Sequence, residues 1–238
     1  MVVNALPRTC ICCGAGGFAQ NAVLWPELIA EWELSPDEAA AVDLQQGYHC
    51  TTCGSNLRTM VLARAITRAF GGPEPFAAFV HTEPARALRI LEINEAGGLT
   101  QFLKDMPQHT LAEFPAVDMT ALPYEDGAFD LVCHSDTLEH VPQPVDALRE
   151  CRRVLAPGGV LAYTVPIIPH RPTRRRDLLE PSYHAGPAER LAEFLVHTEY
   201  GHDAWHQVID AGFDECRIVS IAAPIAYALL AVAYRDSE

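Results

Sequence analysis

Two cysteine pairs carry the most specific chemistry in this sequence. Cys10-Ile-Cys12-Cys13-Gly14 and Cys50-Thr-Thr-Cys53-Gly54 share the pattern C-x-x-C-G. Two intervening residues let both sulfurs of a pair turn toward one ion, and the following glycine permits a tight turn. The two pairs together predict a tetrahedral four-thiolate site for structural Zn²⁺, with Cys10, Cys13, Cys50 and Cys53 as ligands. A redox pair or inert buried thiols are the alternatives, although a redox C-x-x-C would not need a second pair.

A second candidate for chemistry is the stretch Asp136-Thr-Leu-Glu139-His140. At a helix start, Asp136 and Glu139 would form a variant of the capping box, which explains both residues without a function. Alternatively, Asp136, Glu139 and His140 share one helical face and could bind a divalent ion or supply a base. The residues themselves leave both interpretations open.

Arginines gather in the segment Pro166–Arg176, and guanidinium groups suit an anionic substrate. A solvated loop is the simpler alternative. Histidines in and after this segment offer general bases near neutral pH, although each could equally be a surface or packing residue. They are His170, His184, His197, His202 and His206.

Composition limits the partners of this chain. Its 238 residues are 49% hydrophobic and 20% charged, which predicts a globular protein with a sizeable core. With 31 acidic and 17 basic residues, the net charge of −14 argues against a broad surface for nucleic acid or an anionic membrane. The first residues lack a signal peptide, and no apolar stretch is long enough to span a bilayer. We therefore expect a cytoplasmic protein, with the oligomeric state left open and a homodimer as one option.

Helices are expected around the cysteines. Ser35-Pro36-Asp37-Glu38 has the pattern of a helix start, and the helix should end near Gly47. Leu57–Phe70 has apolar residues at helical spacing, which predicts one buried face. Gly71–Pro75 then interrupts the pattern, so we predict a zinc module with a connecting helix at 1–71 and a second domain at 72–238. The acidic module would staple the N-terminus or contact a partner.

Strand and helix patterns alternate after this boundary, which predicts a mainly parallel sheet covered on both faces. Ligands of such sheets bind at the carboxyl ends of the strands. The expected strands are Leu88–Ile93, His109–Phe114, Asp130–Ser135, Gly158–Val165, Cys216–Ile221 and Leu229–Tyr234. The expected helices are Leu99–Met106, Pro144–Leu155 and Asp203–Ala211.

Four motifs in this order resemble the class I S-adenosylmethionine-dependent methyltransferases. They are Ile90-Leu-Glu-Ile93, the stretch Ala121–Val132, Ser135-Asp-Thr-Leu-Glu-His-Val141, and Arg153-Val-Leu-Ala-Pro-Gly-Gly-Val160. The resemblance implies a Rossmann-like fold, with a mostly parallel seven-stranded sheet, helices on both faces and S-adenosylmethionine as cofactor. The second cysteine pair continues as Cys53-Gly-Ser-Asn-Leu-Arg58, which is similar to methyltransferases that carry an N-terminal four-cysteine module.

The resemblance also implies roles for individual residues. Glu92–Gly98 corresponds to the glycine-rich cofactor loop, with Asn94 and Ala96 in place of two glycines and a methyl group where the ligand should pass. Glu113 would hold the ribose hydroxyls, while Asp118 would lie near the adenine amino group and Met119 on the ring; solvated loop acids are the alternative. The implied cofactor contacts are Glu92, Ile93, Asn94, Gly97, Gly98, Glu113, Asp118, Met119, His134 and Ser135. Arg171, Arg174 and Tyr200 would bind substrate, and His140, Asp136 and His170 would be catalytic.

Methyl transfer to a small-molecule acceptor, at oxygen or nitrogen, is the function this resemblance implies. An anionic acceptor would suit the arginines of the segment Pro166–Arg176. One alternative is methylation of RNA or protein, against which the net charge of −14 argues. Another is a cofactor-binding protein without methyl transfer, which the replacements Asn94 and Ala96 motivate.

Overall fold

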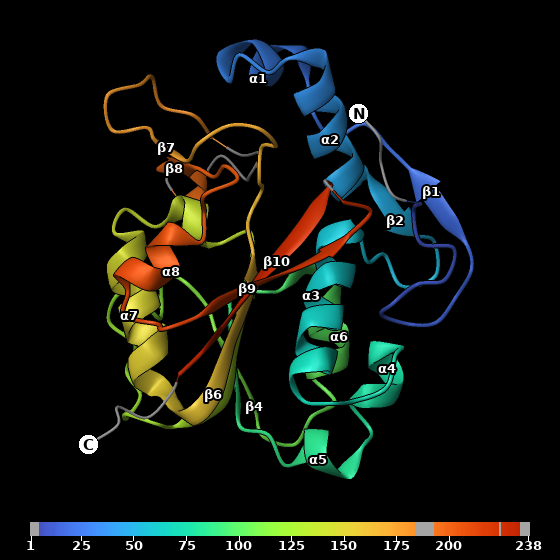
Figure 1. Ribbon diagram of the computed structural model, residues 1–238, viewed down its shortest axis with the longest axis vertical. Helices are drawn as coiled ribbons and strands as arrows, with labels where there is room; N and C mark the ends of the chain where they lie inside the picture. The colour runs from blue at the N-terminus through green and yellow to red at the C-terminus, as the bar shows by residue number, and fades with distance from the viewer. Residues whose placement is uncertain (1–4, 184–192, 224, 234–238) are drawn as a thin grey trace.

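A computed structural model describes residues 5–183, 193–223 and 225–233 of the chain, and Figure 1 shows its arrangement. A central sheet has the strand order β4-β3-β5-β6-β10-β9. The strands are β3 (Ile90–Ile93), β4 (His109–Ala112), β5 (Phe129–Ser135), β6 (Leu155–Thr164), β9 (Cys216–Ile221) and β10 (Ala226–Val232). Helices cover both faces, so the fold is Rossmann-like.

Parallel pairing dominates the sheet, as predicted. β4, β3, β5 and β6 pair in parallel, and only β10 runs against its neighbours β6 and β9. The predicted number of seven strands is wrong for the described residues, where this sheet is six-stranded. The reason lies in the link between β4 and β5, which forms turns closed by Val117 N–H to Glu113 O and Ala121 N–H to Asp118 O, and not another strand.

Two apolar cores lie on the two faces of the sheet, beneath the helices that cover each face. Figure 1 shows these helices on both sides of the sheet. One face is covered by α3 (Leu57–Ala69), with α4 (Phe76–Phe79), α5 (Glu83–Arg86), the 3₁₀ turn Gly97–Leu99 and α6 (Thr100–Leu103) beside it. The other is covered by α7 (Pro144–Val154) and α8 (His206–Asp210). Because α3 lies between the sheet and the N-terminal segment, it is buried nearly all round and not on one face alone.

The N-terminal segment contains α1 (Pro26–Glu31), α2 (Pro36–Gly47) and a small antiparallel sheet of β1 (Phe18–Gln20) and β2 (Tyr48–Cys50). The predicted helix start is confirmed: Ser35 and Glu38 exchange hydrogen bonds as a capping box at the start of α2. The backbone of Phe76 donates to Ile11 O at 2.8 Å. Contacts and core residues are therefore shared across the predicted boundary at 71/72, which itself stays a prediction.

The segment after β6 folds over the end of the sheet and contacts α1 and α2. It contains the short strands β7 (Arg174–Arg175) and β8 (Thr198–Glu199), which pair antiparallel. Ile168 and Val196 pack in one apolar cluster with Trp32 of the N-terminal segment. Trp32 Nε1 also donates to Ser182 Oγ at 2.7 Å, and Gln45 Nε2 to Ile167 O at 2.8 Å. In the described ranges, no helix has the length and apolar character needed to cross a membrane.

Candidate functional site

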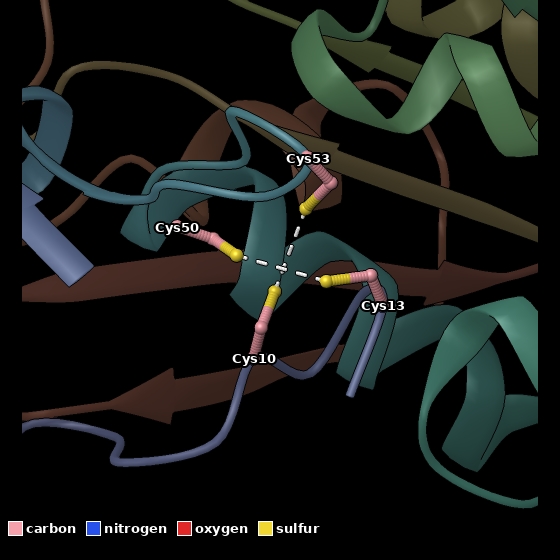
Figure 2. A group of neighbouring side chains, drawn as sticks. All are labelled: Cys10, Cys13, Cys50 and Cys53. Atoms are coloured by element: carbon pink, nitrogen blue, oxygen red, sulfur yellow. Dashed lines mark hydrogen bonds between the residues drawn. The ribbon is translucent and has the colours of Figure 1, made fainter. Parts of the chain in front are cut away.

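The four predicted cysteine ligands meet at one point (Figure 2). All four Sγ atoms lie within 4.8 Å of one another, with Cys10–Cys53 at 3.7 Å and Cys13–Cys50 at 3.6 Å. Each pair is closed by the same turn, in which the glycine N–H donates to the first cysteine's carbonyl: Gly14 to Cys10 at 2.8 Å and Gly54 to Cys50 at 2.9 Å. Both glycines have positive φ, 83° and 74°, which explains their presence after each pair.

This geometry fits a tetrahedral thiolate site. With Zn–S bonds of about 2.3 Å, the sulfurs of such a site are separated by about 3.8 Å. The spacing of the four Sγ atoms agrees with this value, and all eight cysteines are free of disulfides. Cys12, between two ligands, is fully buried and is not part of the cluster.

A cavity of about 610 Å³ opens at the carboxyl ends of β3, β4 and β5. This is where a sheet of this topology binds ligands, and the volume is in the range of small-molecule sites. Seven of the predicted site residues line it: Ile93, Asn94, Glu113, Asp118, Met119, Asp136 and His140. The others that line it include Glu95, Phe114, Val117, Thr137, Gln143, Glu193, Phe194 and His197.

Asn94 joins the three strand ends that form the cavity floor. Its backbone has φ +53°, the left-handed conformation that asparagine tolerates. The side-chain Oδ1 accepts from Phe114 N at 3.0 Å, and Nδ2 donates to Thr137 Oγ1 at 3.5 Å. Asn94, at a position where the family has glycine, thus preserves the turn. Its side chain also forms hydrogen bonds with the segments after β4 and β5.

Ala96, Gly97 and Gly98 do not line the cavity. The sequence places the Ala96 methyl group where the ligand should pass. In the structure this methyl group is buried in the core beside α3 and leaves the cavity open. A Cβ on Gly98 would lie 2.8 Å from Ser55 Oγ, and one on Gly97 would lie 3.2 Å from Thr59 Oγ1. These two glycines therefore permit close approach of the cysteine-rich segment and the first turn of α3.

Glu92 is a support for this loop and is not at the cavity surface. The side chain is fully buried. Oε1 accepts from Ala96 N at 2.8 Å and from Thr100 Oγ1 at 2.6 Å, while Oε2 lies 2.7 Å from His109 Nε2. The predicted direct contact of Glu92 with the cofactor is corrected to a role in fixing the turn after β3.

His140 is the candidate base in the cavity. Its Nδ1 lies 3.0 Å from Leu195 O, and because a carbonyl only accepts, Nδ1 carries the proton and Nε2 is the basic nitrogen. Burial lowers the pKa of His140 below its ordinary value, which favours the neutral imidazole. Burial also lowers the pKa of His197, which lines the same cavity.

Asp136 and Glu139 have different surroundings from those expected. Asp136 has φ +52° and its Oδ2 accepts from Arg58 Nη2 at 3.1 Å, so it does not cap a helix. The helical turn at Leu138–His140 is a 3₁₀ turn with Thr137 as its N-cap, and Glu139 is buried below the cavity. Burial, followed by the charge of Asp136, raises the pKa of Glu139. Among the described residues, Asp136, Glu139 and His140 do not converge on an ion site.

The predicted substrate arginines are engaged in ion pairs outside the cavity. Arg171 binds Glu38 through Nε at 2.5 Å and Nη2 at 2.7 Å, and Nη1 donates to Trp32 O at 2.9 Å. Arg174 binds Glu199 at 2.7 Å, and Arg176 binds Glu199 and Glu31. Neither Arg171 nor Arg174 lines the large cavity. Both line a smaller cavity of about 220 Å³ together with Tyr200, so their role in substrate binding stays a prediction.

Four other predicted residues lie elsewhere. His170 lines a separate apolar cavity with His202 and Trp205, so it does not meet His140. The His134 ring is fully buried and stacks on Tyr163 at 4.7 Å, and burial lowers its pKa to about 3. Ser135 Oγ is within 2.8 Å of Thr164 Oγ1, and Tyr200 OH donates to Gln207 Oε1 at 2.9 Å. None of these four side chains lines the large cavity, and their predicted roles stay predictions. His184 lies outside the described residues.

Several residues that line the large cavity carry no functional signal in the sequence. Phe114, Phe194 and Glu193 come from links between elements, where no periodicity marks them. In the sequence, Arg58 is only the final residue of the motif that begins at Cys53. In the structure it donates a hydrogen bond to Asp136, which lines the cavity. Its position five residues after Cys53, at the start of a buried helix, is the signal that could have found it.

One part of the chain is similar to a known family. Residues 78–163, which include β3, β4, β5 and α7, match the family model described as "Methyltransferase domain". The matched region contains most of the residues that line the large cavity, including Asn94, Glu113, Asp136 and His140.

Curated relatives are similar to part of this chain. An uncharacterized methyltransferase of Mycobacterium sp. (strain JLS) is 33% identical over 144 residues, covering 56% of this chain and 48% of that protein. A sarcosine/dimethylglycine N-methyltransferase of Halorhodospira halochloris is 33% identical over 98 residues, covering 41% and 35%. The chain thus spans about half or less of the length of these relatives.

Comparison with solved structures returned an S-adenosylmethionine-dependent methyltransferase of Thermotoga maritima, described as a possible histamine N-methyltransferase. It has 14% sequence identity and a TM-score of 0.42, covering 74% of this chain and 90% of that one.

Proposed function

We propose that this chain is an S-adenosylmethionine-dependent methyltransferase that methylates a small-molecule acceptor at oxygen or nitrogen. The observation that carries the proposal is the cavity of about 610 Å³ at the carboxyl ends of β3, β4 and β5, within the matched methyltransferase domain. Relatives that methylate nitrogen and relatives that methylate oxygen both support the proposal. One is a sarcosine/dimethylglycine N-methyltransferase and another is a ubiquinone biosynthesis O-methyltransferase. S-adenosylmethionine supplies the electrophilic methyl group when it is bound.

The proposed cofactor half of the cavity lies beside the segment after β4. Glu113 is exposed to the cavity, where its carboxylate can accept from two vicinal hydroxyl groups. Asp118 Oδ1 already accepts from Thr120 N at 2.8 Å, which fixes this carboxylate at the cavity edge. Met119 supplies an apolar surface for an aromatic ring.

The proposed acceptor half lies beside the turn after β5. His140 is held as the neutral tautomer with Nε2 basic, so it can take a proton from an acceptor hydroxyl or ammonium group. Carboxylates and imidazoles line this cavity, and no arginine or lysine does so among the described residues. We therefore propose a neutral or cationic acceptor and withdraw the expectation of an anionic one.

We also propose that the four-cysteine cluster binds one structural Zn²⁺. The donor set, the sulfur spacing and the paired turns support this assignment. Metal analysis of the purified protein should find one zinc per chain, and Cys53→Ser should abolish it. Cys12→Ala is the matched control, since Cys12 is a buried neighbour outside the cluster, and zinc should be retained. Absence of metal in freshly purified, folded wild-type protein would refute the assignment.

Turnover tests the enzymatic proposal. Purified protein is incubated with S-adenosylmethionine and a panel of amines and phenols, and release of S-adenosylhomocysteine is measured. We expect acceptor-dependent release, lowered about 100-fold or more in His140→Gln. His202→Gln is the control, because His202 lines the separate apolar cavity. No release with any acceptor, from protein that binds the cofactor, would favour the alternative of a binding protein without methyl transfer.

A further inference from the structure

Arg58 connects the cysteine-rich segment to the wall of the methyltransferase cavity. It lies in the first turn of α3, and its side chain is 1% exposed. Nη2 donates to Oδ2 of Asp136 at 3.1 Å, while Nε and Nη1 have no hydrogen-bond partner among the described residues. A buried guanidinium remains charged, so it requires a carboxylate nearby, and Asp136 is the one within ion-pair distance.

Asp136 is held in an unusual conformation at the point where it meets the cavity. Its φ of +52° is sterically disfavoured for a residue with a Cβ and must be maintained by its surroundings. The side chain is 34% exposed and lines the cavity beside His140. Arg58 is the ion-pair partner that approaches Asp136 from the side of α3.

Arg58 lies in a helix that begins directly after the second cysteine pair. Asn56 caps α3 by accepting from Thr59 N at 2.9 Å, three residues after Cys53. Cys53 O accepts from Gln101 Nε2 at 3.0 Å, and Ser55 fits against Gly98. The cysteine turn, the start of α3 and the loop after β3 therefore form one contact region beside the cavity.

We propose that Arg58 is a positioning residue for methyl transfer: it orients Asp136 at the cavity wall from a helix that begins directly after the four-cysteine centre. The inference rests on the proposed function, since it assigns a role within the same cavity. Asp136 and His140 act together in this account. Arg58 screens the negative charge of Asp136, and so limits how strongly that charge stabilises protonated His140.

A pH profile separates this role from a purely structural one. The groups acting on His140 are Asp136 from the end of β5, Glu139 in the same turn, His197 before β8, and Glu193, which lines the same cavity. In Arg58→Met the unscreened Asp136 should shift the acid limb of kcat/KM to higher pH. The value of kcat/KM at neutral pH should fall on the order of 10-fold to 100-fold. Cofactor affinity should change less than kcat.

Arg64→Met is the matched control, because Arg64 lies on the same helix and also loses an ion pair, with Glu74. It should leave both the pH profile and kcat unchanged. Arg58→Lys should recover part of the activity, since it restores the charge. If Arg58→Met proves unstable, the double variant Arg58→Met/Asp136→Asn is used, because it removes both charges of the ion pair. This double variant should fold but should not recover activity.

Three results would overturn the proposal. They are an Arg58→Met profile identical to that of the Arg64→Met control, an acid limb shifted to lower pH, or full activity in the double variant. Absence of turnover in the wild-type protein is a different result, since it contradicts the proposed function and not the positioning role alone.

Discussion

His140 and Asn94 show how single residues adapt the cavity. Asn94 takes a glycine position and uses its side chain to join the ends of β4 and β5. His140 donates a hydrogen bond from Nδ1 to the Leu195 carbonyl, and burial lowers its pKa, which favours the neutral ring. Both roles depend on a side-chain amide or imidazole group. The residue type was therefore enough to indicate Asn94 and His140 as candidates in the sequence. Their hydrogen-bond partners could be identified only from the folded structure.

The pH dependence of turnover follows from His140. Burial lowers the pKa of His140 below the ordinary value of about 6.5. The neutral imidazole, which is the form that can accept a proton, therefore remains populated at lower pH than in an exposed histidine. The kcat/KM profile should be level above pH ~6.5 and fall on the acid side with an apparent pKa below that value. His140→Gln should remove this limb. An apparent pKa above the ordinary value, or a limb that persists in the variant, would contradict the assignment.

Elements near the cysteine cluster pack against the loop after β3. Gly97 and Gly98 leave room for Thr59 and Ser55, and Glu92 fixes the same loop from below. The glycine-rich pattern in the sequence was interpreted as backbone approach to a ligand. In the structure, Gly97 and Gly98 instead allow the loop after β3 to pack closely against the segment that contains Ser55 and Thr59.

Hydrogen exchange should report this coupling between elements. Cys53→Ser should increase amide exchange in residues 97–103 by on the order of 10-fold, because the contacts of Gln101 with Cys53 O and of Gly98 with Ser55 loosen. Exchange in α7, on the opposite face of the sheet, should remain unchanged. Cys12→Ala provides the control for loss of a buried thiol. Equal protection of residues 97–103 in both variants would contradict the coupling.

Over the whole molecule, patterns local in sequence were predicted better than pairings between distant segments. The strands, the capping box of α2 and the cysteine site follow from local spacing, and the structure contains each. The arginines of the segment Pro166–Arg176 could not be assigned in this way. Arg171 binds Glu38 in α2, and the residues are 133 positions apart, so local sequence contains no sign of the pair. The acidic N-terminal segment thus neutralises a basic segment of its own chain.

Stability of the whole molecule should depend on this pairing. Arg171 binds the Glu38 carboxylate and two backbone carbonyls, and the guanidinium lowers the pKa of Glu38 to about 2. Arg171→Met should lower the free energy of unfolding by about 2–4 kcal/mol at neutral pH. Because the pKa of Glu38 is lowered by folding, its contribution is present above pH ~4.3 and is lost as the pH falls toward 2.

Urea denaturation at pH 7 measures this effect, with Arg217→Met as the control. Arg217 forms an exposed ion pair with Glu215, and its loss should change the free energy of unfolding by less than about 1 kcal/mol. If Arg171 bound substrate instead, its replacement would raise the acceptor KM and leave stability unchanged.

Cofactor binding tests the central claim most directly. Titration calorimetry of the folded protein with S-adenosylmethionine should show one site per chain. Glu113→Gln, which removes the charge of the proposed hydroxyl-binding group, should weaken binding about 10-fold or more, equivalent to about 1.4 kcal/mol. Glu125→Gln, an exposed acid outside the cavity lining, should bind as the wild type does. A flat titration of well-folded wild-type protein, or equal affinities of the two variants, would contradict the account.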